Sequence, residues 1–238
     1  LGEKYFRDIV SLQYHLDYPG FDPMNQNNPV PATTRSFYYG IPTVPFAVLD
    51  GGISESFRYE FSDLKTTPIL DYIALGTLEK PDFDIDLVVD WGEDTLKTTT
   101  TVTCIADEYA EYIQLYLVVF ETSVSAYTGM NGDTLFKNVV LDMLPTPAGK
   151  LLSNAWEFGF SDTMKNIWVY QPYIEDLEDL AVVAFVQDRK TGQILQADVV
   201  HKDIRVDLEE VPALTHLRIY PNPAKDIVYV NLGSTTEA

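Results

Sequence analysis

A series of short β-branched runs between residues 81 and 207 constrains the fold more than any other feature of this chain. The runs are rich in Val, Ile and Thr, and turn signals such as "WGED", "GMNGD" and "KTGQ" separate them. Several alternate apolar and polar residues, as strands with one buried face do. Little helix is expected between them, so they predict an antiparallel β-sandwich. The runs are "DFDIDLVVDW", "LKTTTTVTCIAD", "YIQLYLVVFE", "LAVVAFVQD" and "ILQADVVHKDIRVDL".

The first 80 residues have a different pattern, which predicts a mixed α/β segment. Thr67 followed by Pro68 is typical of a helix N-cap and first helical position, and glycines mark the ends of two candidate helices. The expected elements are a strand at 8–16, a short helix or turn at 32–40 that closes on Gly40, an apolar strand with a turn at 44–52, and a helix from Pro68 to Gly76.

The chain is strongly acidic, with 36 Asp and Glu against 16 Lys and Arg and a formal net charge of −20. This field disfavours nucleic acids and anionic membrane surfaces as partners. The longest strongly apolar run, at 180–186, is too short to cross a bilayer, so we expect no transmembrane segment. The first residues lack the pattern of a signal peptide. We therefore expect either that such a peptide has been removed or that the chain begins inside a longer product.

Residues 82–93 place acids where a calcium-binding EF-hand loop has its ligands. Leu87, however, occupies the loop position that requires glycine, and Phe83 and Ile85 alternate with the acids. That alternation favours a half-buried strand over a calcium site.

No other motif predicts catalysis or a bound cofactor. His15, His201 and His216 are far apart in the sequence, and Cys104 lies in a strand pattern typical of a buried, inert thiol. Nucleotide-binding and serine-hydrolase motifs are absent. We therefore expect no catalytic, cofactor or metal residues. The aromatic clusters "RSFYYG" and "VYQPY" favour buried anchors over exposed stacking platforms.

The order of several blocks resembles the outer membrane protein 28-related proteins of Bacteroidota. The blocks are "YHLDYPGFDPMN", "TTRSFYYG", "VPFAVLDGG", "LFKNVVLDMLPTPAG" and "VVAFVQDRKTGQILQA". The resemblance implies an exported protein in which a thioredoxin-like segment precedes a β-rich domain. The stretch "YYGIPTVPFAVLDGG" also resembles a strand of thioredoxin-like proteins, and this resemblance implies a cis peptide bond at Pro45, with Pro42 as the second choice. The chain departs from thioredoxin-like proteins because it has no C-x-x-C pair, and thiol exchange needs two thiols.

The C-terminal stretch "LRIYPNPAKDIVYVNLG" holds two short β-like runs around a Pro-Asn-Pro turn. It resembles the beginning of the C-terminal sorting domain of type IX secretion substrates. That domain normally continues through further strands, whereas this sequence stops at Ala238. The residues that match the motif and the following strand are Ile219, Tyr220, Pro221, Asn222, Pro223, Lys225, Val228 and Val230.

The sequence therefore predicts an α+β protein: a partial thioredoxin-like α/β segment, an antiparallel immunoglobulin-like sandwich and a short C-terminal hairpin. The expected divisions are residues 1–80, 81–207, a linker at 208–216, and 217–238. We expect an exported, non-enzymatic structural or adhesive protein at the outer-membrane surface or outside the cell. Its expected partner is the type IX machinery, with other surface proteins or its own copies as further candidates.

Three alternative functions stay open at this point. The first is a thiol-disulfide oxidoreductase whose C-x-x-C lies upstream of Leu1. The second is a glycan- or peptide-binding module. The third is an assembly subunit that pairs strand edges between copies.

Overall fold

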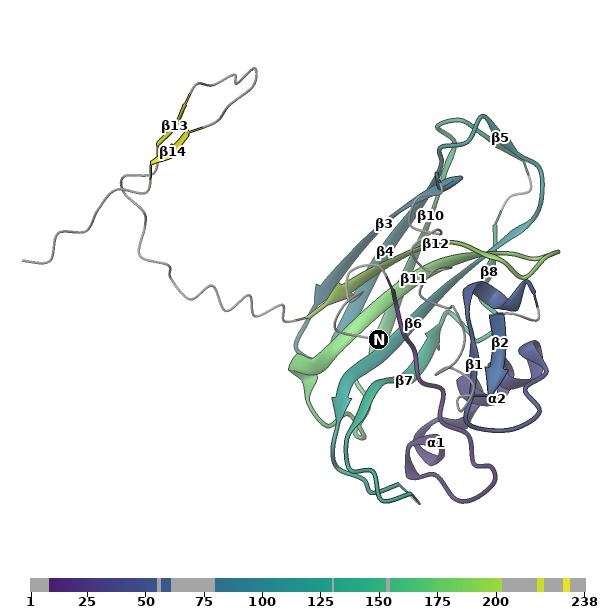
Figure 1. Cartoon of the computed structure of the whole chain (residues 1–238), viewed down its shortest axis with the longest axis vertical. Coiled ribbons are helices and arrows are strands. Elements are labelled where there is room, and N and C mark those ends of the chain that lie inside the picture. Colours follow the sequence, from purple (N-terminus) through teal and green to yellow (C-terminus); the bar gives the residue numbers. More distant parts are fainter. Residues whose placement is uncertain are drawn as a thin grey trace, which may run out of the picture. The chain divides into compact units, whose positions relative to one another are not determined.

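Two antiparallel sheets dominate the fold in a computed structural model that describes residues 9–54, 57–60, 80–129, 131–152, 155–202, 218–220 and 229–231. The three-strand sheet has the order β10 (Ser161–Val169), β4 (Thr95–Cys104) and β3 (Phe83–Trp91). The five-strand sheet has the order β12 (Ile194–His201), β11 (Leu180–Asp188), β6 (Ile113–Val124) and β7 (Phe136–Leu144), with β8 (Lys150–Leu151) also paired to β6. All these pairings are antiparallel, and Figure 1 shows the strands running side by side.

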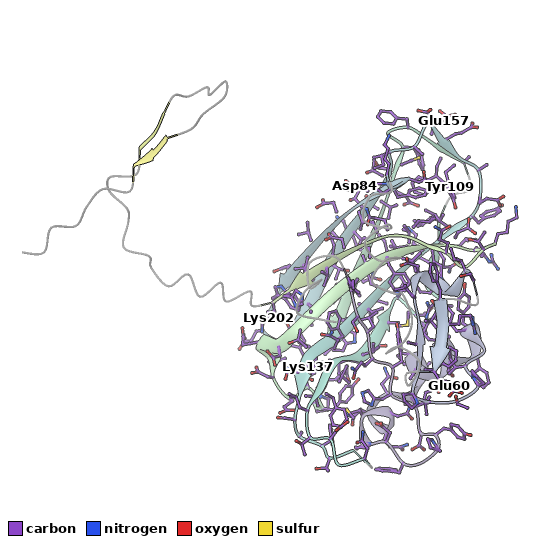
Figure 2. The ribbon with its side chains drawn as sticks, in the orientation of Figure 1. Glu60, Asp84, Tyr109, Lys137, Glu157 and Lys202 are labelled. Atoms are coloured by element: carbon purple, nitrogen blue, oxygen red, sulfur yellow. The ribbon has the colours of Figure 1, made fainter. Side chains whose placement is uncertain are left out.

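The alternation in β3 follows from the two-residue period of a strand. Phe83, Ile85 and Leu87 are buried between the sheets, while Asp84 and Asp86 between them are exposed. Figure 2 shows Asp84 on this sheet. The prediction of a strand over these residues, rather than a calcium loop, is confirmed.

Strand β11 is buried along its whole length because both of its faces are covered. Val182 and Ala184 belong to the core between the two sheets. Val183 and Phe185 belong to a second core on the opposite face of the five-strand sheet. A strand covered on both sides needs an almost continuous apolar run, and the sequence "LAVVAFV" supplies one.

Side chains close the corner between β3 and β12, where no backbone ladder joins the two sheets. The Asp198 carboxylate Oδ2 accepts the backbone N–H of Leu87 at 3.2 Å. The Gln196 Nε2 donates to the carbonyl of Phe83 at 3.4 Å. These side chains satisfy backbone groups along the β3 edge that would otherwise be open to another strand.

Residues 9–54 and 57–60 cover the outer face of the five-strand sheet. Their helices are short and defined by caps: Asp22 accepts the N–H groups of Met24 and Asn25, and Gly40 ends the second helix at φ +57°. Figure 1 shows this purple segment beside β6 and β7, and Figure 2 labels Glu60 on its hairpin. The elements are α1 (Pro23–Asn27), α2 (Pro29–Tyr39), β1 (Phe46–Val48), a 3-10 turn η1 (Asp50–Gly52) and β2 (Arg58–Glu60).

Arg35 anchors α2 to the sheet. Its side chain is buried, and its guanidinium carbon lies 4.5–5.6 Å from the centroids of four aromatic rings. Each desolvated cation–π contact of this kind is worth up to about 2 kcal/mol. The guanidinium also donates to the Tyr39 hydroxyl and to Gln187 Oε1. The rings are those of Tyr38, Tyr39, Tyr116 and Phe185.

The expected α+β class with a thioredoxin-like α/β segment is wrong. The fold is β-rich and built from antiparallel sheets, and the described part of residues 1–80 holds two short helices and an antiparallel β1–β2 hairpin. The reason is that the described residues of this segment form no layered sheet of their own and instead pack on the sandwich. The strand expected at 8–16 is reduced to an isolated bridge between Gln13 and Val139. The helix expected from Pro68 to Gly76 lies outside the described residues.

The chain divides into two compact units, residues 1–203 and 204–238. In the second, β13 (Arg218–Tyr220) pairs antiparallel with β14 (Tyr229–Asn231). The linker expected at 208–216 lies outside the described residues. The four-part division of the sequence stays a prediction.

Candidate functional site

The residues of the expected sorting motif fall partly on described strands. Ile219 and Tyr220 lie in β13, and Val230 lies in β14 opposite Ile219. The two strands therefore flank the Pro-Asn-Pro segment in the sequence. Pro221, Asn222, Pro223, Lys225 and Val228 lie outside the described residues.

The peptide bond before Pro45 is cis, as are those before Pro19 and Pro145. Pro45 directly precedes β1 and has no thiol beside it, because the one cysteine of the chain lies in β4. The Cys104 side chain has no exposed surface, its Sγ donates to the carbonyl of Ala106 at 3.5 Å, and burial raises the pKa of its thiol. This environment makes the thiol unreactive.

The histidines of the described residues have structural surroundings. His15 Nδ1 lies 2.9 Å from the Asp22 carboxylate, and its ring meets the ring of Phe136 edge-on. His201 is half-buried near Phe120, and desolvation lowers the pKa of its imidazole. His216 lies outside the described part. Within the ranges that the structure describes, no three His, Cys, Asp or Glu side chains gather in a way that could hold a metal ion.

The carboxyl of Glu121 on β6 has a strongly shifted pKa. It is fully buried, and burial raises its pKa to about 7. Its Oε1 accepts the backbone N–H of Asp176 at 2.6 Å, whereas its Oε2 has no partner. The cavity beside it, shared with Asn28 and Tyr173, measures only about 10 Å³. That space suits one water molecule and no substrate, so we assign Glu121 to holding the loop around Asp176.

A larger groove lies where residues 16–18, helix α2 and residues 41–44 meet, with a volume of about 280 Å³. Its first wall is tied to α1 by hydrogen bonds. The backbone N–H of Asp22 donates to Asp17 Oδ1 at 2.9 Å, and Asn25 Nδ2 donates to the carbonyl of His15 at 2.7 Å. Residues 41–44 form its opposite wall. They lie there because Gly40, in the left-handed conformation, ends α2 and turns the chain back.

Two aromatic rings line this groove and stay largely open to solvent. Tyr18 is 60% exposed and Phe37 is 80% exposed. Arg35 and Tyr39 are one helical turn apart and face the sheet, so Phe37 between them points to the opposite side of α2. The expectation that the "RSFYYG" cluster supplies buried anchors therefore fails for Phe37. The spacing of Arg35 and Tyr39 on one helix face was the signal that could have identified it.

The polar side chains that the structure describes in the groove supply hydroxyls, one amide and one carboxylate. Ser36 Oγ donates to the carbonyl of Thr33 at 2.9 Å. Asn25 is only 4% exposed, and its Oδ1 has no partner among the described residues. Asp17 engages only its Oδ1. The groove therefore combines apolar rings with hydrogen-bond acceptors that are left free.

Neither a protein-family profile nor a curated protein matches the sequence. Among solved structures, HBP35 of Porphyromonas gingivalis is similar over 88% of this chain and 70% of its own, with 20% sequence identity and a TM-score of 0.60. A domain of the outer membrane lipoprotein Omp28 from the same bacterium matches 52% of this chain and 89% of its own, with 14% identity and a TM-score of 0.37. The first likeness shows a shared fold, and the second is too distant to carry an argument.

None of the helices in the described ranges is long and apolar enough to cross a membrane.

Proposed function

We propose that this chain is an exported, non-enzymatic protein of the bacterial surface or medium, sent there by type IX secretion. The observation that carries the proposal is the "IYPNP" motif at residues 219–223, whose Ile219 and Tyr220 lie in β13, the strand that pairs with β14 further along the chain. The fold shared with HBP35 of Porphyromonas gingivalis supports a relationship to proteins of that group of bacteria. The groups described above form no catalytic constellation, which supports a structural or adhesive role over an enzymatic one.

The partner in export is the type IX machinery, which would recognise the unit at residues 204–238. The test compares the full gene product with a form that lacks everything from Leu217 onward, in a host that has type IX secretion. We expect the truncated protein to stay in the periplasm while the intact protein reaches the surface or the medium. Cell fractionation followed by immunoblotting measures this distribution.

A matched pair of substitutions sharpens the test. Replacing Pro221, Asn222 and Pro223 together by alanine alters the motif, whereas replacing three residues of the expected linker at 208–216 by alanine leaves it intact. Only the first change should cause retention. A strain without the secretion machinery should retain all forms equally. Equal export of intact and truncated protein in the competent strain would refute the proposal.

A second candidate function is a glycan- or peptide-binding module. The groove beside Tyr18 and Phe37 favours it, because exposed aromatic rings next to free acceptors are a common way to hold a ligand. Binding and export are compatible, since an adhesive surface protein needs both.

A further inference from the structure

The side chains that line the groove expose a large apolar surface to solvent. Tyr18 and Phe37 line it with exposures of 60% and 80%, and Ile41, Pro42 and Val44 add aliphatic surface. Exposed rings at the edge of a hollow offer a flat face to a ligand that also has an apolar face. Such a ligand removes this area from water when it binds.

The hydrogen-bonding state of the polar groups limits the ligand further. One N–H of Asn25 Nδ2 donates to the His15 carbonyl, and the Oδ1 of this side chain, which is only 4% exposed, is a free acceptor among the described residues. One oxygen of Asp17 is also free, and no hydrogen bond engages the Thr43 hydroxyl among the described residues. Acceptors outnumber donors here, so the matching ligand carries several O–H or N–H donors.

Charge excludes most ionic ligands. Among the described residues that line the groove there is no Lys or Arg, and the chain carries a net charge of −20, so anions are repelled. Asp17 is the one carboxylate in the part of the lining that the structure describes, and one of its oxygens already accepts the N–H of Asp22. A strongly held cation would need more than this single partner. A neutral, donor-rich molecule with an apolar face fits best.

We propose that the groove between residues 16–18, α2 and residues 41–44 binds a neutral sugar, with a pyranose ring stacked on Phe37 and its hydroxyls donating to Asn25 and Asp17. A pyranose presents C–H groups on one face and hydroxyl donors around its rim, which are the two properties that the groove requires. The volume of about 280 Å³ holds one or two such rings. The inference does not depend on the route of export, because the groove lies in the unit of residues 1–203.

The test uses the purified full chain, a panel of methyl glycosides of glucose, galactose, mannose and N-acetylglucosamine with their disaccharides, and a Lys-rich peptide as a cationic probe. Saturation-transfer NMR and calorimetry measure binding at two salt concentrations. We expect at least one neutral saccharide to bind with a Kd of about 1 mM or tighter, equally at both salt concentrations. Phe37→Ala should weaken that binding about fivefold, because an aromatic contact is worth about 1 kcal/mol.

Phe158→Ala is the matched control, since Phe158 is 72% exposed and does not line the groove. Because Phe37 is also mostly exposed, neither variant should change the unfolding midpoint, so loss of binding cannot be confused with loss of folding. A panel that gives no binding overturns the proposal. So does equal binding by the two variants, or selective binding of a Lys-rich peptide that added salt abolishes, which would assign the groove to a cationic partner.

Discussion

Replacing the buried Glu121 by glutamine should stabilise the sandwich at neutral pH and leave it almost unchanged at acidic pH. Burial raises the pKa of this carboxyl from its ordinary 4.5 to about 7, so its ionisation in the folded state costs at most about 3 kcal/mol. This is an upper value because water entering the adjacent cavity would solvate the charge. Nearby Glu175 and Asp179 raise the pKa further, while the backbone N–H groups of residues 175 and 176 lower it.

The sign follows from proton binding. Between pH 4.5 and about 7 the folded state keeps the Glu121 proton while the unfolded chain has released it. The contribution of Glu121 to the free energy of unfolding is therefore complete below pH 4.5 and is lost as the pH rises to about 7. Glutamine never ionises. The free energy of unfolding of the variant should therefore rise above that of the native protein across this pH window, and the difference should persist at higher pH.

Urea denaturation from pH 4 to pH 8, followed by tryptophan fluorescence, measures this difference. Trp91, Trp156 and Trp168 all lie in the unit of residues 1–203, so the signal reports that unit. Glu175→Gln is the control of opposite sign, because hydrogen bonds from Ser125 lower the pKa of Glu175. That variant should lose stability at neutral pH, and its deficit should shrink as the pH falls below about 4.5. A difference for Glu121→Gln that does not change with pH would refute the reasoning.

Three further perturbations test other contacts. Gly51→Ala should lower the free energy of unfolding by about 3 kcal/mol or more, because Gly51 has φ +77° and a Cβ there would lie 1.8 Å from the carbonyl oxygen of Gly192. Gly132→Ala is its control, since Gly132 has φ +87° but lies in open space. That variant should lose only about 1 kcal/mol in the same urea titration. Arg35→Leu should lower the unfolding midpoint by removing the cation from its aromatic surroundings, and an unchanged midpoint would contradict its anchoring role. The thiol of Cys104 should react with Ellman's reagent only after unfolding, and rapid reaction in the native state would contradict its burial.

The sandwich was predictable because each strand leaves its burial pattern in the sequence. In β3 the alternation of Phe83, Asp84 and Ile85 gives both the strand and the face that is buried. In β11 the unbroken apolar run predicts a strand covered on both sides, although the sequence does not say which segment covers the second face. Local patterns identify strands and faces, and they do not identify what packs on them.

The error in fold class has the same origin. The sequence around residues 44–52 has the local pattern of an apolar strand and a turn, which is shared by many folds. Whether such a strand joins a layered α/β sheet or a two-strand hairpin depends on long-range pairing, and among the described strands β1 pairs with β2 alone. The groove was also missed, because Phe37 and the free oxygen of Asn25 become recognisable only when α2 is docked through Arg35.

The two sides of helix α2 have different roles: one packs on the sandwich and the other lines the groove. The sandwich side carries Ala32, Arg35 and Tyr39, and their packing limits which residues can replace them. The groove side carries Thr33 and Phe37. Substitutions on the groove side can therefore accumulate without endangering the fold. A lineage of such proteins could change its ligand preference residue by residue while keeping the same scaffold, and random mutagenesis of α2 should show tolerance that follows the helical period.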